Sequence, residues 1–202
     1  MVGIVDYGVG NLFSLKSSFK YFGENAELVS EENSILACDR LILPGVGAFG
    51  DAAEALKATG LGDAVKKFAK SGKPLMGICL GMQLLFEKGL EFGEHEGLGL
   101  IPGKVVAINP LVNGNKVPQI GWNSLVFTNN KGDIYKNTEN GEFVYFVHSY
   151  HAECPIEYIT AQTEYGSLLT ASVQYGNVMG TQYHPEKSGE AGLMILKAFC
   201  EI

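Results

Sequence analysis

The chain of 202 residues has few charged side chains, no long basic run and no long apolar run. Charged residues make up 18% of it, against about 25% in an average globular domain. The net charge of -7 argues against a protein that binds nucleic acid non-specifically. The most apolar charge-free segment, residues 74–86, is too short to span a bilayer. We therefore expect no contact with nucleic acid and none with membranes.

Cysteine is scarce and scattered. The four cysteines are Cys38, Cys79, Cys154 and Cys200, and no two form a C-x-x-C pair. This spacing excludes a disulfide framework and a zinc finger, and no other cluster has the spacing of metal ligands. The N-terminus also lacks the basic and apolar regions of a secretory signal. We expect a cytoplasmic protein without a metal.

Glycine, by contrast, is abundant. The chain has 26 glycines, about 13% of its residues against roughly 7% in average usage. Its hydrophobic fraction of 46% excludes a disordered chain, and no glycine recurs at every third position as in collagen. The glycines must therefore serve turns and close backbone approaches inside a folded domain.

The order of apolar patterns predicts the fold class. In the first half, strands expected at 2–7, 26–29, 40–43 and 75–78 alternate with helices at 12–22, 51–58, 61–70 and 80–88. The second half has more strand-like runs, at 105–108, 143–148, 169–174 and 178–183, before a final helix at 189–199. Alternating strands and helices indicate a parallel sheet covered on both faces. We predict a single α/β domain over residues 1–202, with a mostly parallel central sheet flanked by helices and a partly antiparallel second half.

The segment around Cys79 predicts a nucleophile on a sharp strand-to-helix turn. A short apolar strand ends at Cys79, a helix follows at once, and Gly77 and Gly81 stand two residues to either side. On so tight a turn these neighbours approach each other and must be small. The dipole of the following helix would favour thiolate over thiol, and the amide of Leu80 would face a developing oxyanion.

A base and its orienting group are found near the C-terminus. His184 ends an expected strand, and Glu186 lies two residues on, where an extended segment places it on the same side as His184. A carboxylate holding an imidazole that activates a nucleophile is the logic of a catalytic triad. A surface turn is the alternative for this segment, and His148 is a second candidate base.

A glycine loop after an earlier strand offers backbone amides. Residues 44–50 read Pro-Gly-Val-Gly-Ala-Phe-Gly, with no Gly-Lys-Ser/Thr of a P-loop and no G-x-G-x-x-G of a dinucleotide site. Such a loop is suited to an anion or an oxyanion, and an ordinary turn is the alternative.

Together these motifs resemble the class I (triad) glutamine amidotransferases, and among them the glutaminase subunits of imidazole glycerol phosphate synthase. The resemblance rests on Gly77-Ile-Cys-Leu-Gly-Met-Gln83, on Tyr183-His-Pro-Glu186 and on four further segments, which begin at Asp6, Pro44, Gly121 and Val147. It implies that Cys79 attacks glutamine, that His184 transfers protons and that Glu186 orients His184. It also implies an oxyanion hole from Leu80, Val46 and Gly47, and glutamine contacts from Gly47, Gln83, His148, Ser149 and Tyr150.

The resemblance further implies a partner. Such a glutaminase passes ammonia to a (βα)8-barrel cyclase subunit in histidine biosynthesis, and Asn11, Trp122 and Lys187 match positions of that interface. No cofactor is implied. Gln119 stands where many members have His, so a related glutaminase that feeds another synthase, such as a surface-sugar amidotransferase, is an alternative. Three further alternatives for the function are a glutaminase of pyridoxal phosphate synthesis, a γ-glutamyl hydrolase, and a scaffold protein with an inactive triad.

Overall fold

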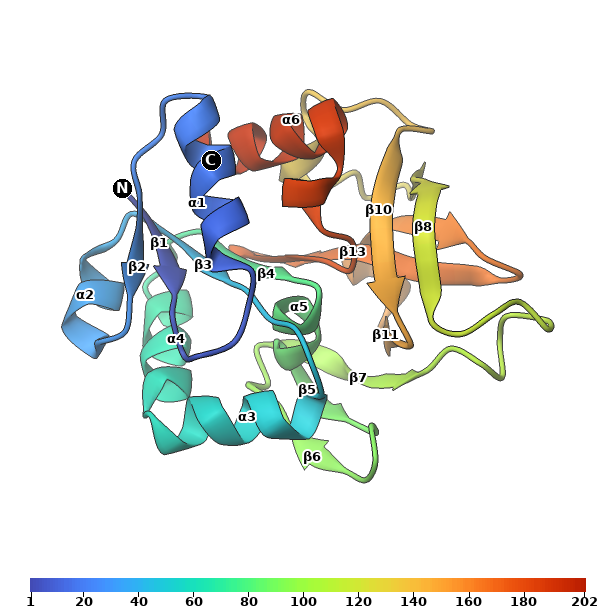
Figure 1. Cartoon of the computed structure of the whole chain (residues 1–202), viewed down its shortest axis with the longest axis horizontal. Coiled ribbons are helices and arrows are strands. Elements are labelled where there is room, and N and C mark those ends of the chain that lie inside the picture. The colour runs from blue at the N-terminus through green and yellow to red at the C-terminus, as the bar shows by residue number, and fades with distance from the viewer.

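A computed structural model describes residues 1–202, and its central feature is an eight-stranded sheet with helices on both faces (Figure 1). The strand order is β2 (Ala26–Val29), β1 (Val2–Val5), β3 (Arg40–Leu43), β4 (Leu75–Ile78), β14 (Val178–Thr181), β13 (Leu168–Tyr175), β12 (Ile159–Glu164) and β9 (Val126–Phe127). The pairings from β2 to β14 are parallel, and those from β14 to β9 are antiparallel. The predicted fold class is therefore confirmed.

Side-chain alternation along the central strands builds a core on each face. Ile4, Ile42 and Met76 pack on one face with α1 (Leu12–Tyr21) and α6 (Gly189–Cys200). Their neighbours Leu41 and Leu75 pack on the other face with α2 (Glu32–Ala37), α3 (Phe49–Ala58) and α4 (Leu61–Lys70). Because both faces are covered, the central strands β1 and β4 are fully buried apolar runs, as expected of a parallel sheet.

Two smaller sheets lie beside the C-terminal edge of β4. One is a ribbon of β8 (Gln119–Ser124) and β10 (Phe143–His148), and the other has the order β11 (Tyr150–Glu153), β7 (Ile101–Ala107), β5 (Phe86–Gly89), β6 (His95–Glu96). Short 3-10 helices cover Asp133–Tyr135, Ile156–Tyr158 and Pro185–Lys187. No helix has both the length and the apolar character needed to cross a membrane.

The expected helix over 80–88 is wrong. Helix α5 covers only Leu80–Leu84, and residues 86–89 form strand β5. The carbonyls of Leu84, Leu85 and Phe86 accept hydrogen bonds from the amides of Leu98, Leu100 and Gly99, at 2.8 to 3.0 Å. These carbonyls are therefore bonded to residues 98–100 and not to amides of a continued helix, although the local apolar spacing predicted a helix there.

Several elements left no local signal and were not predicted. Helix α2 and strands β5, β6, β8, β9, β11 and β12 belong to this group. Most of them are short or mixed in polarity, and strands β8, β9 and β11 pair with strands that are remote in sequence. In contrast, the ranges expected for β2, β3, β4, α4 and β10 match the structure residue for residue.

Candidate active site

Cys79 lies on the predicted strand-to-helix turn, between β4 and α5. Its backbone has φ 56° and ψ -113°, a conformation that non-glycine residues rarely adopt. A Cβ at Gly77 would lie 2.5 Å from the carbonyl oxygen of Gly81, and a Cβ at Gly81 would lie 1.9 Å from that of Leu43. No larger residue fits at either position, so the turn has the geometry of a nucleophile elbow.

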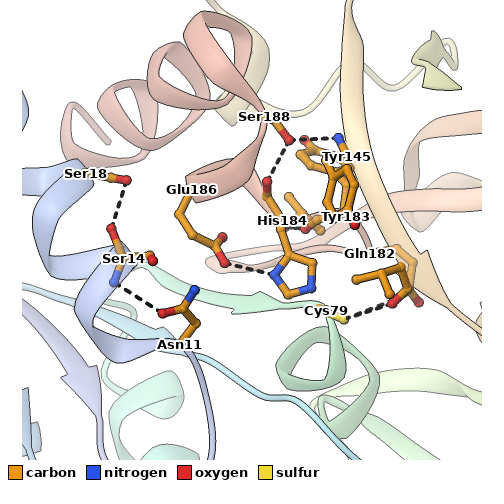
Figure 2. Close-up of polar contacts among 12 residues, drawn as sticks. Asn11, Ser14, Ser18, Cys79, Tyr145, Gln182, Tyr183, His184, Glu186 and Ser188 are labelled. Atoms are coloured by element: carbon orange, nitrogen blue, oxygen red, sulfur yellow. Dashed lines mark hydrogen bonds and ion pairs between the residues drawn. The ribbon is translucent and has the colours of Figure 1, made fainter. Parts of the chain in front are cut away.

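His184 and Glu186 lie on the neighbouring strand end. Strand β14 pairs with β4 in the register Gly180–Gly77 and Thr181–Ile78, so both strands deliver their next residues to the same edge. The imidazole Nδ1 of His184 lies 2.9 Å from Oε1 of Glu186, and both side chains are almost fully buried. Figure 2 shows the other side of the imidazole ring turned toward Cys79. The structure brings the three predicted triad residues together.

The protonation of His184 reflects these two neighbours. Burial lowers the pKa of the imidazole, but hydrogen bonds and charge from Cys79 and Glu186 outweigh burial and raise the pKa to about 9. The charge of Cys79 contributes only in its thiolate form, so the imidazolium and the thiolate stabilise each other. The second carboxylate oxygen of Glu186, Oε2, is buried without a hydrogen-bond partner in the chain.

A cavity of about 400 Å³ opens beside the Cys79 sulfur. Its lining contains every predicted catalytic, oxyanion and substrate residue except Glu186, which lies behind His184, and it also contains Lys187. The chain segments that meet there are far apart in sequence. The predicted catalytic, oxyanion and substrate residues that line the cavity are Val46, Gly47, Cys79, Leu80, Gln83, His148, Ser149, Tyr150 and His184.

The glycine loop packs directly against the elbow. A Cβ at Gly45 would lie 2.8 Å from the amide nitrogen of Gly81 and 2.9 Å from Cβ of Leu80. The buried hydroxyl of Tyr7 donates to the carbonyl of Pro44 at 2.7 Å and holds the start of the loop. The loop thus lies next to the amide of Leu80, which stands in the first turn of α5 and has no acceptor within the helix.

His148 lines the cavity but is engaged within the protein. Its Nδ1 lies 2.8 Å from the carbonyl oxygen of Tyr150, and its Nε2 lies 2.9 Å from Oε1 of Gln119. Burial lowers the pKa of His148 to about 4. A neutral imidazole has one N–H and can donate to only one of these two acceptors. Both ring nitrogens nonetheless face groups of the protein, so the geometry favours His184 over His148 as the base.

Glu91 and Gln182 belong to the site, although sequence reasoning missed them. Glu91 lines the cavity, and its Oε2 accepts from the amide of Phe49 at 2.7 Å. Its position depends on strand β5, which had no local signal. Gln182 is fully buried and donates from Nε2 to the Cys79 sulfur at 3.8 Å. It precedes His184 by two residues, and the alternation of an extended segment could have found it.

Two of the three predicted interface residues lie outside the cavity. Asn11 caps helix α1, where its side-chain oxygen accepts from the amide of Ser14 at 3.4 Å. Trp122 on β8 is 51% exposed and packs edge-on against Tyr145 of β10, with 6.1 Å between ring centroids. Lys187 is exposed at the rim of the cavity.

Comparisons with known proteins agree with this geometry. The model of the glutamine amidotransferase class-I family matches residues 3–201. The imidazole glycerol phosphate synthase subunit HisH of Wolinella succinogenes is 49% identical, and the alignment covers 100% of both chains. The protein of the same name from Caldanaerobacter subterraneus subsp. tengcongensis is also 49% identical, over 100% of this chain and 98% of its own.

Solved structures share the fold at lower identity. The structure of PurLQS from Thermotoga maritima has a chain with a TM-score of 0.77 and 22% identity, covering 99% of this chain and 97% of that one. A crystal structure described as a glutamine amidotransferase has a TM-score of 0.75 and 20% identity, with 98% of each chain covered.

Proposed function

The chain belongs to the class I glutamine amidotransferase family, and on that premise we propose that it is the glutaminase subunit of an imidazole glycerol phosphate synthase. It hydrolyses glutamine to glutamate and ammonia, and the ammonia passes to a cyclase subunit. Full-length relatives at 49% identity carry the name of that subunit. Because the family match covers nearly the whole chain, we treat residues 1–202 as one amidotransferase domain.

Cys79 is the nucleophile of the first half-reaction. Its thiolate attacks the side-chain amide carbon of glutamine, and the carbonyl oxygen becomes an oxyanion in the tetrahedral intermediate. We assign the oxyanion hole to the amide of Leu80 and an amide of the Val46-Gly47 loop, because these residues line the cavity beside Cys79. The His184 imidazolium gives its proton to the leaving nitrogen, so that the C–N bond breaks, ammonia departs and a γ-glutamyl thioester remains.

His184 then acts as a base in the second half-reaction. The neutral imidazole takes a proton from water, and the resulting hydroxide attacks the thioester carbon. Glutamate leaves, the thiolate is restored, and His184 is an imidazolium again. The carboxylate of Glu186, 2.9 Å from Nδ1, keeps the ring oriented in both steps and stabilises its positive charge.

The polar lining of the cavity is suited to the amino-acid end of glutamine. Glu91 is the one carboxylate among the lining residues, and we assign it to the substrate's α-ammonium group. Both amide hydrogens of Gln83 are already used, on the carbonyl of Tyr150 and on Gln182. Gln83 therefore meets the substrate only as an acceptor, through its oxygen, while Gly47, His148, Ser149 and Tyr150 complete the wall.

The outer face of the β8–β10 ribbon is the surface assigned to the (βα)8-barrel cyclase. We call it the ribbon face and define it by Ile120, Trp122, Phe143 and Tyr145, which the antiparallel register places on one side. The first three are exposed apolar side chains. Val147 continues this row and lines the cavity, and Asn11 and Lys187 extend the contact. This surface carries an apolar anchor of the kind that dominates protein interfaces.

The four free cysteines fit a cytoplasmic location.

One observation carries the proposal: Cys79, His184 and Glu186 converge at one edge of the sheet. The test is glutamine hydrolysis, measured as glutamate release with and without the cyclase subunit of the synthase. We expect the cyclase to stimulate the rate, and Cys79→Ala to lower it by ~10⁴-fold or more, as when other enzymes lose their nucleophile. Cys154→Ala, at a half-buried cysteine outside the site, is the matched control. Turnover in Cys79→Ala equal to that of Cys154→Ala would overturn the mechanism.

A further inference from the structure

Two side chains beside the sulfur of Cys79 are sources of stabilisation for a thiolate besides the dipole of helix α5. The helix has only five residues, and the macrodipole of so short a segment is weak. His184 is one source. The side chain of Gln182 is a second polar group next to the sulfur. In Figure 2 the sulfur lies between Gln182 and the imidazole of His184.

The orientation of the Gln182 amide follows from a chain of hydrogen bonds that starts at a group with only one possible role. The backbone carbonyl of Tyr150 can only accept, and it takes a hydrogen bond from Nε2 of Gln83 at 3.0 Å. The second hydrogen of that Nε2 goes to Oε1 of Gln182 at 2.9 Å. Because Oε1 of Gln182 is occupied by Gln83, its Nε2 points to the Cys79 sulfur, at 3.8 Å.

Both glutamines are buried, which keeps this polarity in place. Gln182 is fully buried and Gln83 is 5% exposed, so water does not compete for their amide groups. Reversing Gln182 would turn its oxygen toward the sulfur and set two amide NH2 groups against each other. In a buried site each unmatched polar contact is costly.

We infer that Gln182 is a positioning residue that stabilises the Cys79 thiolate by donating a hydrogen bond to it, with Gln83 fixing the direction of that donor. A donor favours the anionic sulfur over the neutral thiol, because hydrogen bonds to charged groups are the stronger ones. The carbonyl of Val147, 4.0 Å from the sulfur, instead accepts from the thiol form. The inference rests on the proposed role of Cys79 as nucleophile.

The test follows alkylation of Cys79 by iodoacetamide as a function of pH on the full chain, resolved from the other cysteines by peptide mass spectrometry. Only the thiolate reacts, so the profile reports its formation without requiring glutaminase activity. In Gln182→Met, which keeps the length and removes the donor, we expect the midpoint to move up by about one pH unit, or roughly tenfold less thiolate at neutral pH. Gln182→Glu should move it further, because it places a negative charge beside the sulfur.

The control is Gln162→Met, at a half-buried glutamine of β12 whose side chain makes no hydrogen bond within the chain. Should Gln182→Met not fold, Gln83→Met removes the group that directs Gln182, and a smaller shift of the same sign is expected. Profiles of Gln182→Met, or of Gln83→Met in its place, that superimpose on wild type would overturn the inference. A wild-type chain that hydrolyses no glutamine, yet whose midpoint moves in Gln182→Met, would instead overturn the proposed function alone.

Discussion

The edge of the central sheet that carries Cys79 and the ribbon face are built on opposite rules. At the edge, polar side chains are buried and most of their atoms have a specified partner, as in the His184–Glu186 and Gln83–Gln182 pairs. On the ribbon face, large apolar side chains such as Trp122 stand exposed. The two regions are nonetheless neighbours, because Val147 belongs to β10 and also lines the cavity.

This contrast shows how one domain separates chemistry from recognition. Buried polar groups hold the reacting atoms in one geometry and exclude water, which is what electrostatic catalysis requires. An exposed apolar surface costs little until a partner covers it, and then contributes binding energy. The following three predictions test whether the two regions respond to substitution in these different ways.

The largest effect is expected at the buried edge, for Glu186→Gln. The amide keeps the shape but no longer stabilises the imidazolium, so the pKa of His184 should fall from about 9 and kcat should fall by ~10²- to 10⁴-fold. KM should change little, because Glu186 does not line the cavity. The measurement is steady-state glutamine hydrolysis across pH, with Glu190→Gln on the first turn of α6 as control. A kcat within a few-fold of the control value would show that the carboxylate does not support catalysis.

A smaller effect is expected for the pH dependence of stability, through His148. Its pKa is about 4 in the folded chain and about 6.5 in an unfolded one, so the unfolded chain binds more protons between these values. The free energy of unfolding should therefore decrease as the pH falls from 6.5 to 4, by about 3 kcal/mol from this residue. Urea titrations at several pH values should give a shallower acid loss for His148→Gln than for wild type. Parallel curves would mean that the ring is not held neutral.

The smallest effect is expected on the ribbon face, for Trp122→Ala. Removing a large exposed anchor should weaken the affinity for the cyclase subunit by about 30-fold, the order of a hot-spot residue. The unfolding free energy should move little, because the side chain is half exposed. Calorimetric titration measures the affinity, and Tyr21→Ala, at an exposed aromatic residue near the end of α1, is the control. Equal affinities for both variants would place the interface elsewhere.

Much of the fold was predictable because its first half consists of elements with strong local signals. Strand β3 has three consecutive apolar residues before Pro44, and β4 is an apolar run that follows Pro74. Helix α4 has a clear amphipathic pattern. The helix expected over 80–88 was wrong because the carbonyls after Leu84 bind a segment about fourteen residues away. The hydrophobic periodicity of residues 80–88 contains no information about hydrogen bonds to a segment outside them.

The candidate site divides in the same way. The elbow around Cys79 and the His184–Glu186 pair were predictable because each depends on residues within a few positions of one another, including Gly77 and Gly81. Glu91 was not predictable, since its place in the cavity depends on the pairing of β5 with β7. The structure also restricts the role that the resemblance assigns to Gln83, which is contact with glutamine. Its amide hydrogens are used on Tyr150 and Gln182, which no spacing in the sequence indicates.

The sequence by itself determined which groups carry the chemistry and where the backbone turns sharply. Those properties come from side-chain type and from steric limits over a few residues. Only the tertiary structure decided that β14 pairs with β4, which brings His184 to Cys79 across more than a hundred residues. It also decided the direction of each buried amide, because a hydrogen-bond chain takes its polarity from the backbone group at its end, and that group is chosen by packing.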